Sequence, residues 1–572
     1  MTEPRIVARG AERAELLSGG DLPPLLRRIY AARGVCDPAE LDLSLAKLLP
    51  PAQLAQIDRA AARIVAAVTS GQRILFVGDF DADGATSVAL GVSLLQALGA
   101  AHVDFLVPNR FEFGYGLSPE IVALAATRAP DLIITVDNGV SSVAGVAAAT
   151  ARGIDVIVTD HHLPGRELPQ ALAIVNPNLP DCVFASKNLA GVGVIYYVLS
   201  VVRTRLREAG WFETRAEPNL ADWLDLVALG TVADVVPLDR NNRILVLHGL
   251  RRMRGGRCRP GIRALAQVAG RDLNRLTAQD LGFALGPRLN AAGRLDDMTL
   301  GIRCLLAATD AEALERARAL DELNRARREL EQEMVRDAEL LVAQFHLDVS
   351  ERFGVCVYEP GWHQGVIGIV AGRLREKVDR PVIAFADAGP VAPDELKGSA
   401  RSLPELHVRD ALDAIAARYP GLLSKFGGHA MAAGLSIKRV HYERFARAFD
   451  AEVRSRLPAS ALTRTLLSDG ELDGTDFTLE TARLLSESGP WGQGFPEPTF
   501  HGEFELVSQR VVGEQHLKLV VRAGRRVMDA IAFRQPPLPE ARRVRLVYRL
   551  AENDWGDLPT LQLMVEHLTA LP

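Results

Sequence analysis

Three aspartates crowd into the stretch Val77-Gly78-Asp79-Phe80-Asp81-Ala82-Asp83-Gly84, directly after the apolar run Ile74–Val77. The residues that follow, Ala85–Leu90, are typical of the start of a helix. A short buried strand, an acidic loop and a helix form the first half of a βαβ unit. Ligands of such sheets bind beyond the carboxyl ends of the strands, where crowded carboxylates are costly unless cations neutralise them. The stretch therefore predicts a divalent-metal site.

Two other interpretations of this acidic stretch have to be weighed. An EF-hand loop also opens with Asp-x-Asp-x-Asp-Gly, but it needs a preceding helix and a Glu at its twelfth position. Here a strand-like run precedes the loop, and counting from Asp79 places Leu90 at that position. A solvated acidic turn fits the stretch taken alone, and it loses ground only if other segments supply ligands in the same way.

From Arg73 onward the chain alternates between short apolar runs and helical stretches. This alternation predicts an α/β fold whose parallel sheet is covered on both faces. The predicted strands are Ile74–Val77, His102–Val107, Leu132–Val136, Val156–Thr159 and Ala173–Val175. The predicted helices between them include Ser87–Leu98, Ser118–Thr127 and Ser141–Ala151.

Residues of metal-ligand type follow two more of these strands, and a fourth candidate lies further along the chain. Asp137-Asn138-Gly139 follows one strand, and Asp160-His161-His162 follows the next. Because parallel strands end at the same edge of a sheet, we expect all three clusters to converge there. Asp234, after the helix-like stretch Trp223–Leu229, stands among apolar neighbours and needs a partner or a metal. Carboxylates with imidazole and without thiolate favour Mn²⁺ or Mg²⁺ over zinc.

Length and composition set the frame for this site. The chain has 572 residues, of which 48% are apolar and 24% charged, so we expect several globular domains. Its five cysteines are far apart and form no C-x-x-C pair, which argues against a disulfide scaffold and fits a reducing compartment. The N-terminus does not resemble a signal peptide, and the longest apolar run, Val192–Val202, is too short to span a bilayer. We therefore expect a cytoplasmic protein without membrane contact.

The charge of the chain does not by itself indicate a nucleic-acid binder, since the net charge is −5. Six arginines nevertheless crowd between Arg251 and Arg263. Such a run is either an ordinary solvated face or a surface that tracks phosphates.

The pattern divides the chain into five segments. They are a helical lead-in (1–55), the α/β metal domain (56–308), a long connecting helix (309–347), a smaller α/β domain (348–457) and a C-terminal β-domain (458–572). The long helix opens with the capping box Thr309-Asp310-Ala311-Glu312. Two glycine-bearing segments of the smaller domain, Gly398–Ser402 and Gly427–Gly434, read as loops that can approach a phosphate. Five short strands after Ser468 fit a small barrel of the OB type.

The motifs together resemble those of the DHH phosphoesterase superfamily and, within it, the RecJ family of single-stranded-DNA exonucleases. The likeness covers nearly the whole chain. The segments that carry it are Gly78–Gly84, Val107–Arg110 with Gly114-Tyr115-Gly116, Val136–Gly139, Asp160-His161-His162, Ala233–Pro237, Gly286–Arg294 and the stretch Trp491–Pro498 that leads into the barrel.

The resemblance implies two bound ions, Mn²⁺ or Mg²⁺. One would be held by Asp83, Asp137, His161 and Asp234, and the other by Asp81 and Asp137, with Asp137 as the bridge. Many relatives carry a histidine where this chain has Val77, so the first ion is either bound more weakly or has Asp79 or Asp160 as a further ligand. Two cations about 3.5–4 Å apart lower the pKa of a bridging water and stabilise both oxygens of an in-line displacement.

Candidate substrate contacts come from both α/β domains. His162 either faces a phosphoryl oxygen or orients His161. Three arginines can clamp phosphates or form ordinary ion pairs, and one asparagine can hold a phosphate or sugar oxygen or cap a turn: Arg110, Arg288, Arg294 and Asn290. The resemblance adds Ser399, Arg401 and His429 of the smaller domain as contacts that face the metals.

The function implied by the resemblance is a metal-dependent exonuclease that degrades single-stranded DNA from 5′ to 3′, releases 5′-mononucleotides and acts in recombination and repair. A single-strand-binding protein and a helicase are the expected partners, and a monomer is the expected state. Two alternatives stay open at this point. One is a DHH phosphodiesterase for short oligonucleotides or cyclic dinucleotides, and the other is a non-catalytic clamp on single-stranded DNA.

Overall fold

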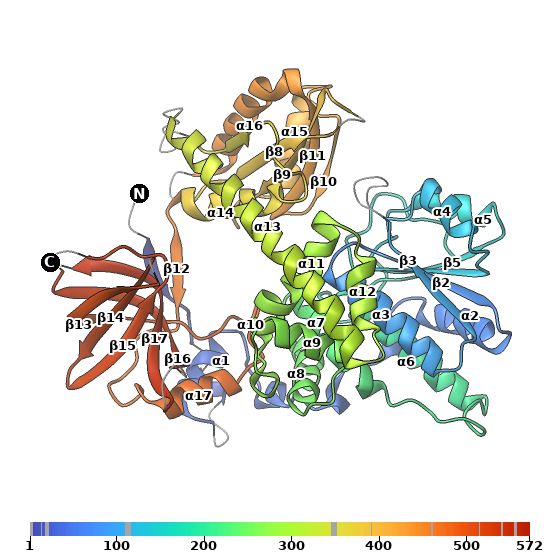
Figure 1. The fold of residues 1–572 in the computed structure, drawn as a ribbon, viewed down its shortest axis with the longest axis horizontal. Helices are drawn as coiled ribbons and strands as arrows, with labels where there is room; N and C mark the ends of the chain where they lie inside the picture. The colour runs from blue at the N-terminus through green and yellow to red at the C-terminus, as the bar shows by residue number, and fades with distance from the viewer. Residues whose placement is uncertain are drawn as a thin grey trace. The chain divides into compact units, whose positions relative to one another are not determined.

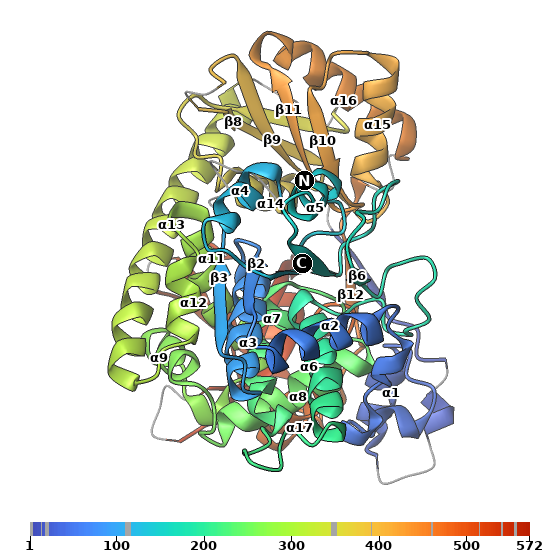
Figure 2. The ribbon, with the colours of Figure 1, turned by 90° about the vertical axis from the view of Figure 1, so that its right-hand side faces the viewer.

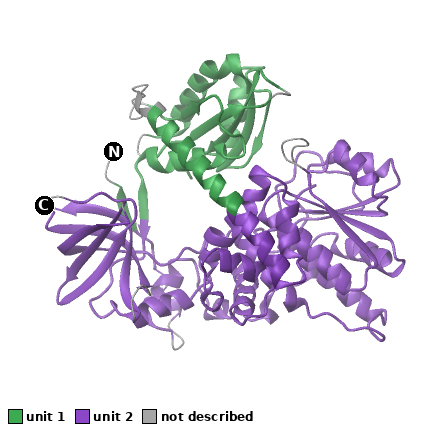
Figure 3. Ribbon diagram, in the orientation of Figure 1, with its two compact units in different colours: residues 1–7, 322–466 green, residues 8–321, 467–572 purple. Residues whose placement is uncertain are grey.

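The computed structural model describes most of the chain (Figure 1). The described residues are 4–12, 14–17, 22–108, 116–344, 352–389, 392–458, 462–513, 515–538, 541–553 and 558–571, with the side chains of 341–344 left aside. They form two compact units (Figure 3). One consists of residues 1–7 and 322–466, and the other of residues 8–321 and 467–572. Each unit is built around its own sheet or sheets.

The larger unit contains the predicted parallel sheet. Its strands are β2 (Arg73–Gly78), β3 (His102–Leu106), β4 (Leu132–Val136), β5 (Asp155–Thr159) and β6 (Ala173–Val175). All of them pair in parallel, in the order β3-β2-β4-β5-β6. Continuous apolar runs fill the central strands, because both faces of a parallel sheet are buried. The expected α/β fold is confirmed for this sheet.

Helices cover both faces of the sheet. The helices α2 (Ile57–Thr69), α3 (Ala82–Ala97) and α6 (Gly191–Glu208) lie on one face. The helices α4 (Pro119–Ala126) and α5 (Val143–Thr150) lie on the other face, as Figures 1 and 2 show. The connection that leaves β2 therefore crosses one face, whereas the connection that leaves β4 crosses the opposite face. Ligands of open α/β sheets bind at such a switch point between neighbouring strands.

The start of α3 differs from the sequence prediction, which placed it between Ala85 and Ser87. The helix begins at Ala82, and Asp81 is its N-cap, with Oδ1 accepting a hydrogen bond from the Gly84 backbone N–H at 2.9 Å. Asp83 consequently lies inside the first helical turn rather than in a loop. Glycine in a first turn hid the helix start from the sequence, because glycine is more often a helix breaker.

Further helices complete this part of the unit. They are α7 (Leu224–Ala233), α8 (Arg240–Arg254), α9 (Pro260–Val268), α10 (Ala278–Asp280), a π-helical turn at Leu281–Leu285, α11 (Gly286–Leu295) and α12 (Thr299–Leu305). Three of them, α7, α11 and α12, contact α3. The long helix α13 (Asp310–Gln344) follows as predicted, and the boundary between the compact units falls within it. No helix in the described part of the chain is both long and apolar enough to cross a membrane.

The N-terminal lead-in is less helical than predicted. Its described residues contain one α-helix, α1 (Pro24–Ala31), several short 3-10 turns and the strand β1 (Arg5–Ala8), which pairs with β12 (Thr465–Ser468). Prolines at positions 23, 24, 38, 50 and 51 explain the short turns, because proline fits the first turn of a helix but not its interior.

The smaller unit contains a mixed sheet in the order β10-β11-β9-β8-β7. Its elements are β7 (Val355–Tyr358), α14 (Ile367–Val378), β8 (Val382–Asp387), β9 (Glu395–Arg401), α15 (Val408–Arg418), β10 (Lys425–Gly428), β11 (Ala432–Lys438) and α16 (Tyr442–Arg456). The expected loop at Gly398–Ser402 is wrong, since residues up to Arg401 belong to strand β9. The expected loop at Gly427–Gly434 is a hairpin of β10 and β11.

The C-terminal residues form the predicted barrel within the larger unit. The strands β13 (Phe500–Val512), β14 (His516–Ala523), β15 (Arg526–Ala532), β16 (Arg543–Asn553) and β17 (Thr560–Leu571) close in the order β13-β14-β15-β17-β16. Helix α17 (Leu479–Glu487) precedes them. Alternating burial along β14 places Leu517, Leu519 and Val521 in the barrel core. The five-stranded OB-like barrel is thus confirmed.

Candidate metal centre

The acidic loop lies at the switch point of the parallel sheet. Asp79 follows β2 directly, Asp81 caps α3 and Asp83 lies in the first turn of α3. Asp79 is 6% exposed and Asp83 is fully buried. The strand and the helix together therefore place three carboxylates within five residues at one edge of the sheet.

The Asp83 carboxylate is held by the N-terminus of another helix. Oδ2 accepts a hydrogen bond from the Gly191 N–H at 2.6 Å, and Oδ1 accepts one from the Val192 N–H at 3.0 Å. Both donors belong to the first turn of α6, where backbone N–H groups lack partners within the helix and favour negative charge. A Cβ at Gly230 would lie 2.9 Å from Asp83 Oδ1, so the opposite wall of this pocket needs glycine.

Asp137 extends from β4, the strand next to β2. Its backbone is in the left-handed region, with φ of 61°, and its side chain is buried. The Asp137 N–H donates to Thr159 O at 3.1 Å, and this hydrogen bond ties the residue to the neighbouring strand β5. Such a backbone costs free energy in a residue other than glycine, and strained residues of this kind concentrate at functional sites.

His161, after β5, completes the centre of the cluster. Its Nε2 atom lies 3.0 Å from Asp137 Oδ1, 3.5 Å from Asp234 Oδ2 and 4.0 Å from Asp83 Oδ2. Asp234 reaches this point from the C-terminal end of α7, where it is the C-cap residue. Four elements distant in sequence thus direct their side chains to one place.

Asp160 and His162 flank the centre. Asp160 is buried, and its Oδ1 accepts hydrogen bonds from the His161 N–H at 2.7 Å, the His162 N–H at 3.0 Å and His162 Nδ1 at 2.8 Å. Its Oδ2 accepts a hydrogen bond from the Val140 N–H at 2.9 Å. The carboxylate of Asp160 therefore orients both histidines, and the His162 side chain remains 46% exposed.

Three groups of side chains bring ligand atoms within 4.8 Å of one another: Asp79 with Asp81 and Asp137, Asp83 with His161 and Asp234, and Asp137 with His161 and His162. The groups share Asp137 and His161, so they form one continuous cluster. Asp160 belongs to none of the groups found among the described residues.

The residues present fit divalent cations. His161 Nε2 and Asp234 Oδ2 are buried, and neither atom has a hydrogen-bond partner in the described part of the protein. Buried polar atoms without partners are rare in native structures unless an ion or a functional role accounts for them. Oxygen ligands with one imidazole suit Mn²⁺ or Mg²⁺. Cations at this cluster would therefore satisfy atoms that the protein alone leaves unsatisfied.

The electrostatics of the cluster also favour the binding of cations. Burial, followed by the charge of Asp81, raises the pKa of Asp83 to about 7. Burial and the surrounding carboxylates also raise the pKa values of Asp137 and Asp234 well above the ordinary value. Burial and the charge of His162 lower the pKa of His161 to about 4, which keeps its imidazole neutral. Excess negative charge beside a neutral imidazole is the condition in which metal binding is favourable.

His162 behaves differently from His161. Burial lowers its pKa, but the hydrogen bond and the negative charge of Asp160 outweigh burial and raise the pKa to about 9. The same hydrogen bond lowers the pKa of Asp160 although burial opposes this shift. The cluster thus holds one neutral and one protonated histidine near neutral pH.

The motif Gly286–Arg294 supports the acidic loop from behind. Asn290 Oδ1 accepts a hydrogen bond from the Ala82 N–H at 2.8 Å, at the start of α3. A Cβ at Gly293 would lie 1.7 Å from Phe80 O, so α11 packs directly on the loop backbone. Arg288 is buried and pairs with Asp321 at 2.8 Å, which matches the ion-pair alternative. Arg294 is partly exposed on the last turn of the same helix.

The remaining candidate contacts lie elsewhere. Ser399 and Arg401 are neighbours on β9 of the smaller unit, where Arg401 Nη1 donates to Ser399 Oγ at 3.1 Å. Burial lowers the pKa of Arg401. His429 lies in the turn between β10 and β11 and is exposed. Arg110 lies outside the described residues.

Two asparagines of the site were missed in the sequence. Asn178 Nδ2 donates to His161 O at 2.6 Å, and Asn176 Nδ2 donates to His162 O at 2.9 Å. Both follow β6, the last strand of the sheet, so the rule that strand ends carry function applied to Asn176-Pro177-Asn178 as well.

Comparison with known proteins extends over almost the whole chain. The family model described as "DHH family, N-terminal domain" matches residues 73–231, "DHHA1 domain" matches 349–455 and "RecJ OB domain" matches 468–567. The first of these ranges contains the three strand-end clusters.

Individual relatives match over the same length. The single-stranded-DNA-specific exonuclease RecJ of Dickeya dadantii is 54% identical over 559 residues, which cover 96% of each protein. The crystal structure of RecJ from Thermus thermophilus in complex with Mn²⁺ is 30% identical with a TM-score of 0.82, over 99% of this chain and 79% of that one. The structure of the same protein with Mg²⁺ is 28% identical with a TM-score of 0.75, over 99% of this chain and 78% of that one. This identity over nearly the full length shows that the chain belongs to the RecJ family.

Proposed function

We propose that this protein is a metal-dependent exonuclease that degrades single-stranded DNA from the 5′ end and releases 5′-mononucleotides. The observation that carries the proposal is the convergence of Asp83, Asp137, His161 and Asp234, from four separate elements, on one point. The activity named for the relatives supports the choice of substrate.

The proposed ligands divide between two ions. Asp83, Asp137, His161 and Asp234 would hold one ion, and Asp81, Asp137 and Asp79 would hold the other. Asp79 takes this role because it shares a group with Asp81 and Asp137, and because buried Val77 offers no ligand. When bound, the cations supply an acidified water and stabilise negative charge on the phosphoryl oxygens. The protein itself supplies fixed ligand geometry through α6, Asn178 and Asp160.

His162 is proposed as a substrate contact. It is half-exposed beside the cluster, and Asp160 engages its Nδ1, so that Nε2 is the ring nitrogen that would face the substrate. Because the pKa of His162 is raised to about 9, its ring carries a proton near neutral pH. A protonated imidazole there can donate a hydrogen bond to a phosphoryl oxygen or a proton to the leaving oxygen. Asp160 acts through both histidines as a positioning residue.

The proposal assigns the parts of the chain as follows. Residues 56–308 carry the metals, and Arg294 and Arg110 contact phosphates from this domain. Residues 348–457 contribute Ser399, Arg401 and His429, and residues 458–572 bind the strand. We further propose a monomeric cytoplasmic enzyme of recombination and repair that works with a single-strand-binding protein and a helicase.

One experiment tests the central proposal. Single strands labelled at the 5′ end or at the 3′ end are incubated with Mn²⁺, beside a dinucleotide. We expect early release of labelled mononucleotide from the 5′-labelled strand only. Hydrolysis of the dinucleotide alone would favour a phosphodiesterase for short substrates, and retention of intact strands would favour a clamp.

A substitution at the shared ligand sharpens this test. We expect Asp137→Asn to lower cleavage at least about a thousandfold, because a group that serves both ions loses its charge. The exposed Asp413→Asn serves as the matched control and should cleave like the parent. Near-normal cleavage by Asp137→Asn would refute the two-ion site.

A further inference from the structure

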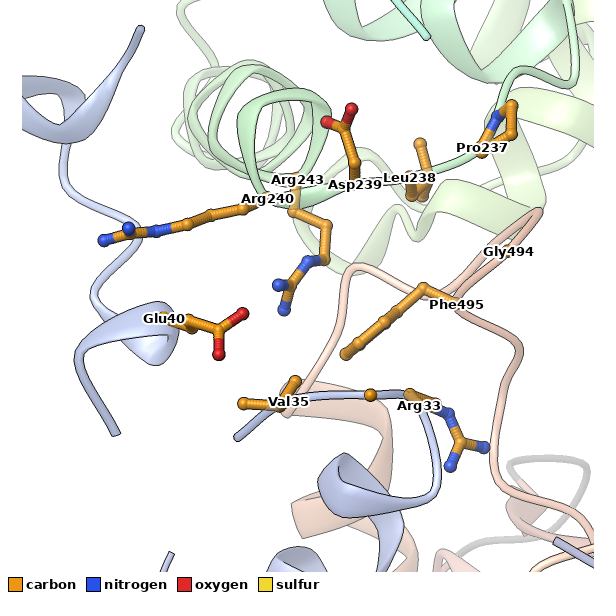
Figure 4. A pocket seen from close by; sticks show the side chains of 11 residues that line it. Arg33, Val35, Glu40, Pro237, Leu238, Asp239, Arg240, Arg243, Gly494 and Phe495 are labelled. Carbon is orange, nitrogen blue, oxygen red and sulfur yellow. The ribbon is translucent and has the colours of Figure 1, made fainter. Parts of the chain in front are cut away.

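A pocket of about 260 Å³ lies apart from the metal cluster, within the larger unit (Figure 4). Three parts of that unit line it: the segment Arg33–Glu40, the residues Pro237–Arg243 at the start of α8, and the turn Gly494-Phe495 before the barrel. None of the residues in the metal cluster lines this pocket.

Arg243 is the unusual residue of the pocket. It is only 4% exposed, and its guanidinium makes neither a hydrogen bond nor an ion pair with the residues that the structure describes. Its Nε atom is buried without a partner among them. The Cζ atom lies 4.1 Å from the centre of the Phe495 ring. A buried cation without an ion-pair partner is costly, and the carboxylates of Glu40 and Asp239 act on Arg243 only through longer-range attraction.

The acids of the pocket are already engaged. Glu40 Oε1 accepts hydrogen bonds from the Cys36 and Asp37 N–H groups at 3.0 and 3.1 Å. Asp239 accepts from Ser186 Oγ at 2.5 Å and from the Asn242 N–H at 3.0 Å, as the N-cap of α8. Neither carboxylate forms an ion pair with Arg243.

The guanidinium of Arg240 also lacks a carboxylate, but its side chain extends away from that of Arg243 (Figure 4). Arg240 Nη2 donates to the carbonyls of Ala39 and Asp42 at 2.8 and 3.3 Å, and its Nε is buried without a partner in the described structure. Arg33, in contrast, is neutralised by Asp469 at 2.8 Å. Arg243 is thus the arginine of the pocket whose guanidinium neither a salt bridge nor a hydrogen bond within the described part of the protein compensates.

We propose that this pocket binds a phosphoryl group, with the in-plane N–H groups of Arg243 as the paired donors. The inference rests on the proposed function, which brings the phosphates of a strand and of released mononucleotides to this protein. Arginine is suited to this role because its planar fork matches two phosphoryl oxygens.

The pocket matches a phosphate better than a nucleobase. Phe495 contacts Arg243 and also stacks on Trp491, with ring centres 5.2 Å apart at 12°. The ring is therefore used to fix the guanidinium rather than to stack a base. A volume of about 260 Å³ lies below the roughly 300–1,000 Å³ of pockets for larger ligands. It suits one phosphoryl group with its ester substituents.

The test compares variants of the full-length, metal-free protein. Arg243→Met removes the charge, Arg243→Lys keeps the charge but loses the planar fork, and Arg251→Met is the control on an exposed position of the same helix. Unfolding temperatures without ligand show whether each variant folds. If Arg243→Met does not fold, Arg243→Lys decides the outcome.

Three probes are added: inorganic phosphate against chloride at equal ionic strength, thymidine monophosphate, and a fluorescent oligothymidylate. We expect phosphate to raise the unfolding temperature of the parent and of Arg251→Met but not of Arg243→Met, with Arg243→Lys between them. If the strand is the source of the phosphate, the oligonucleotide binds Arg243→Met about tenfold more weakly, and the salt slope of binding falls by about one. If a free nucleotide is the source, thymidine monophosphate stabilises the parent more than Arg243→Met, whereas the oligonucleotide binds both proteins equally.

Identical responses of the parent and both Arg243 variants to all three probes would overturn the proposal. The end-labelled cleavage assay on the parent runs in parallel. Absence of cleavage would refute the proposed function and leave phosphate binding at Arg243 measurable, so the two failures are distinguishable.

Discussion

Asp160 shows how one residue can control a site without lying in it. Its carboxylate receives four hydrogen bonds, and one of them comes from the His162 ring at Nδ1. The sequence allowed Asp160 to be a metal ligand, but its oxygens are directed to backbone N–H groups and to the imidazole. A carboxylate that fixes the orientation of nearby histidines is usual around metal sites.

The substitution Asp160→Asn tests this positioning role. Without the charge of Asp160, burial lowers the pKa of His162 and only the charges of Asp79 and Asp81 still raise it, so the pKa should fall well below about 9. We expect cleavage at pH 8 and saturating Mn²⁺ to fall about 10–100-fold, with partial recovery toward pH 6, where His162 regains its proton. The measurement is the pH profile of cleavage. Asp155→Asn, at the other end of β5, is the control, and a uniform loss at every pH would contradict the role.

The raised pKa values of the ligands predict how metal and pH act together. Asp83 has an ordinary pKa of 3.8 and a pKa of about 7 in the folded protein, so between these values the folded chain binds a proton that the unfolded chain does not. The free energy of unfolding of the metal-free protein should therefore fall as pH rises from about 4 to 7. Mn²⁺ should raise the unfolding temperature more at pH 8 than at pH 6, because protons compete at the lower pH.

Calorimetric scans with and without Mn²⁺ at both pH values measure this effect. Asp137→Asn should show little increase with Mn²⁺ at either pH, since it lacks the shared ligand. If Mn²⁺ raises the unfolding temperature of the parent equally at pH 6 and pH 8, the carboxylates are already ionised at pH 6, contrary to the expectation.

At the scale of elements, the sequence predicts where the strands end and which polar residues follow them. It does not predict which other elements those residues contact. The runs Leu132–Val136 and Val156–Thr159 are continuous and apolar, so their strands and the following clusters were readable in sequence. The contact of Asp83 with the N-terminus of α6 spans 108 positions, and no local pattern announces it. Gly398 and Ser399 are residue types typical of loops and hide strand β9 in the sequence, although buried Leu396, Gly398 and Ala400 alternate with half-buried Lys397, Ser399 and Arg401.

The role of α6 leads to a matched pair of substitutions. A Cβ at Gly191 would lie 2.7 Å from Asp137 Cβ and 2.9 Å from Asp137 Oδ1, inside the cluster. A Cβ at Gly193, two residues later, would meet only the end of the flexible Leu189 side chain at 3.0 Å. We expect Gly191→Ala to lower the free energy of unfolding by about 1–3 kcal/mol and to weaken Mn²⁺ binding at least tenfold. Gly193→Ala should bind Mn²⁺ like the parent.

Titration calorimetry with Mn²⁺ and urea unfolding compare the two variants directly. Equal Mn²⁺ affinity of Gly191→Ala and Gly193→Ala would mean that the first turn of α6 does not hold the ligands in place.

At the scale of the whole molecule, the C-terminal barrel and the N-terminal segment are joined by one buried ion cluster. Arg33 donates to both Asp469 oxygens at 2.8 and 3.0 Å, and Arg9 pairs with the same carboxylate at 3.2 Å. The side chains of Arg33 and Asp469 are almost fully buried. The Leu238 N–H, just before α8, donates to Gln493 O at 2.7 Å and adds a link between the α/β part of the unit and the segment that precedes the barrel. Residues separated by more than 400 positions therefore lie in one compact unit.

We expect Asp469→Asn to destabilise this unit by about 3–5 kcal/mol, because two arginines lose the charge that compensates them. Scanning calorimetry should show the transition that includes the barrel lowered by at least about 5 °C. The exposed Glu471→Gln, two residues away, is the control and should unfold like the parent.

Since Arg33 also lines the pocket of Arg243, phosphate should stabilise Asp469→Asn at least as much as the parent, because the freed guanidinium adds positive charge to the pocket wall. If Asp469→Asn lowers the barrel transition and also abolishes the stabilisation by phosphate, Asp469 instead holds the pocket walls in position.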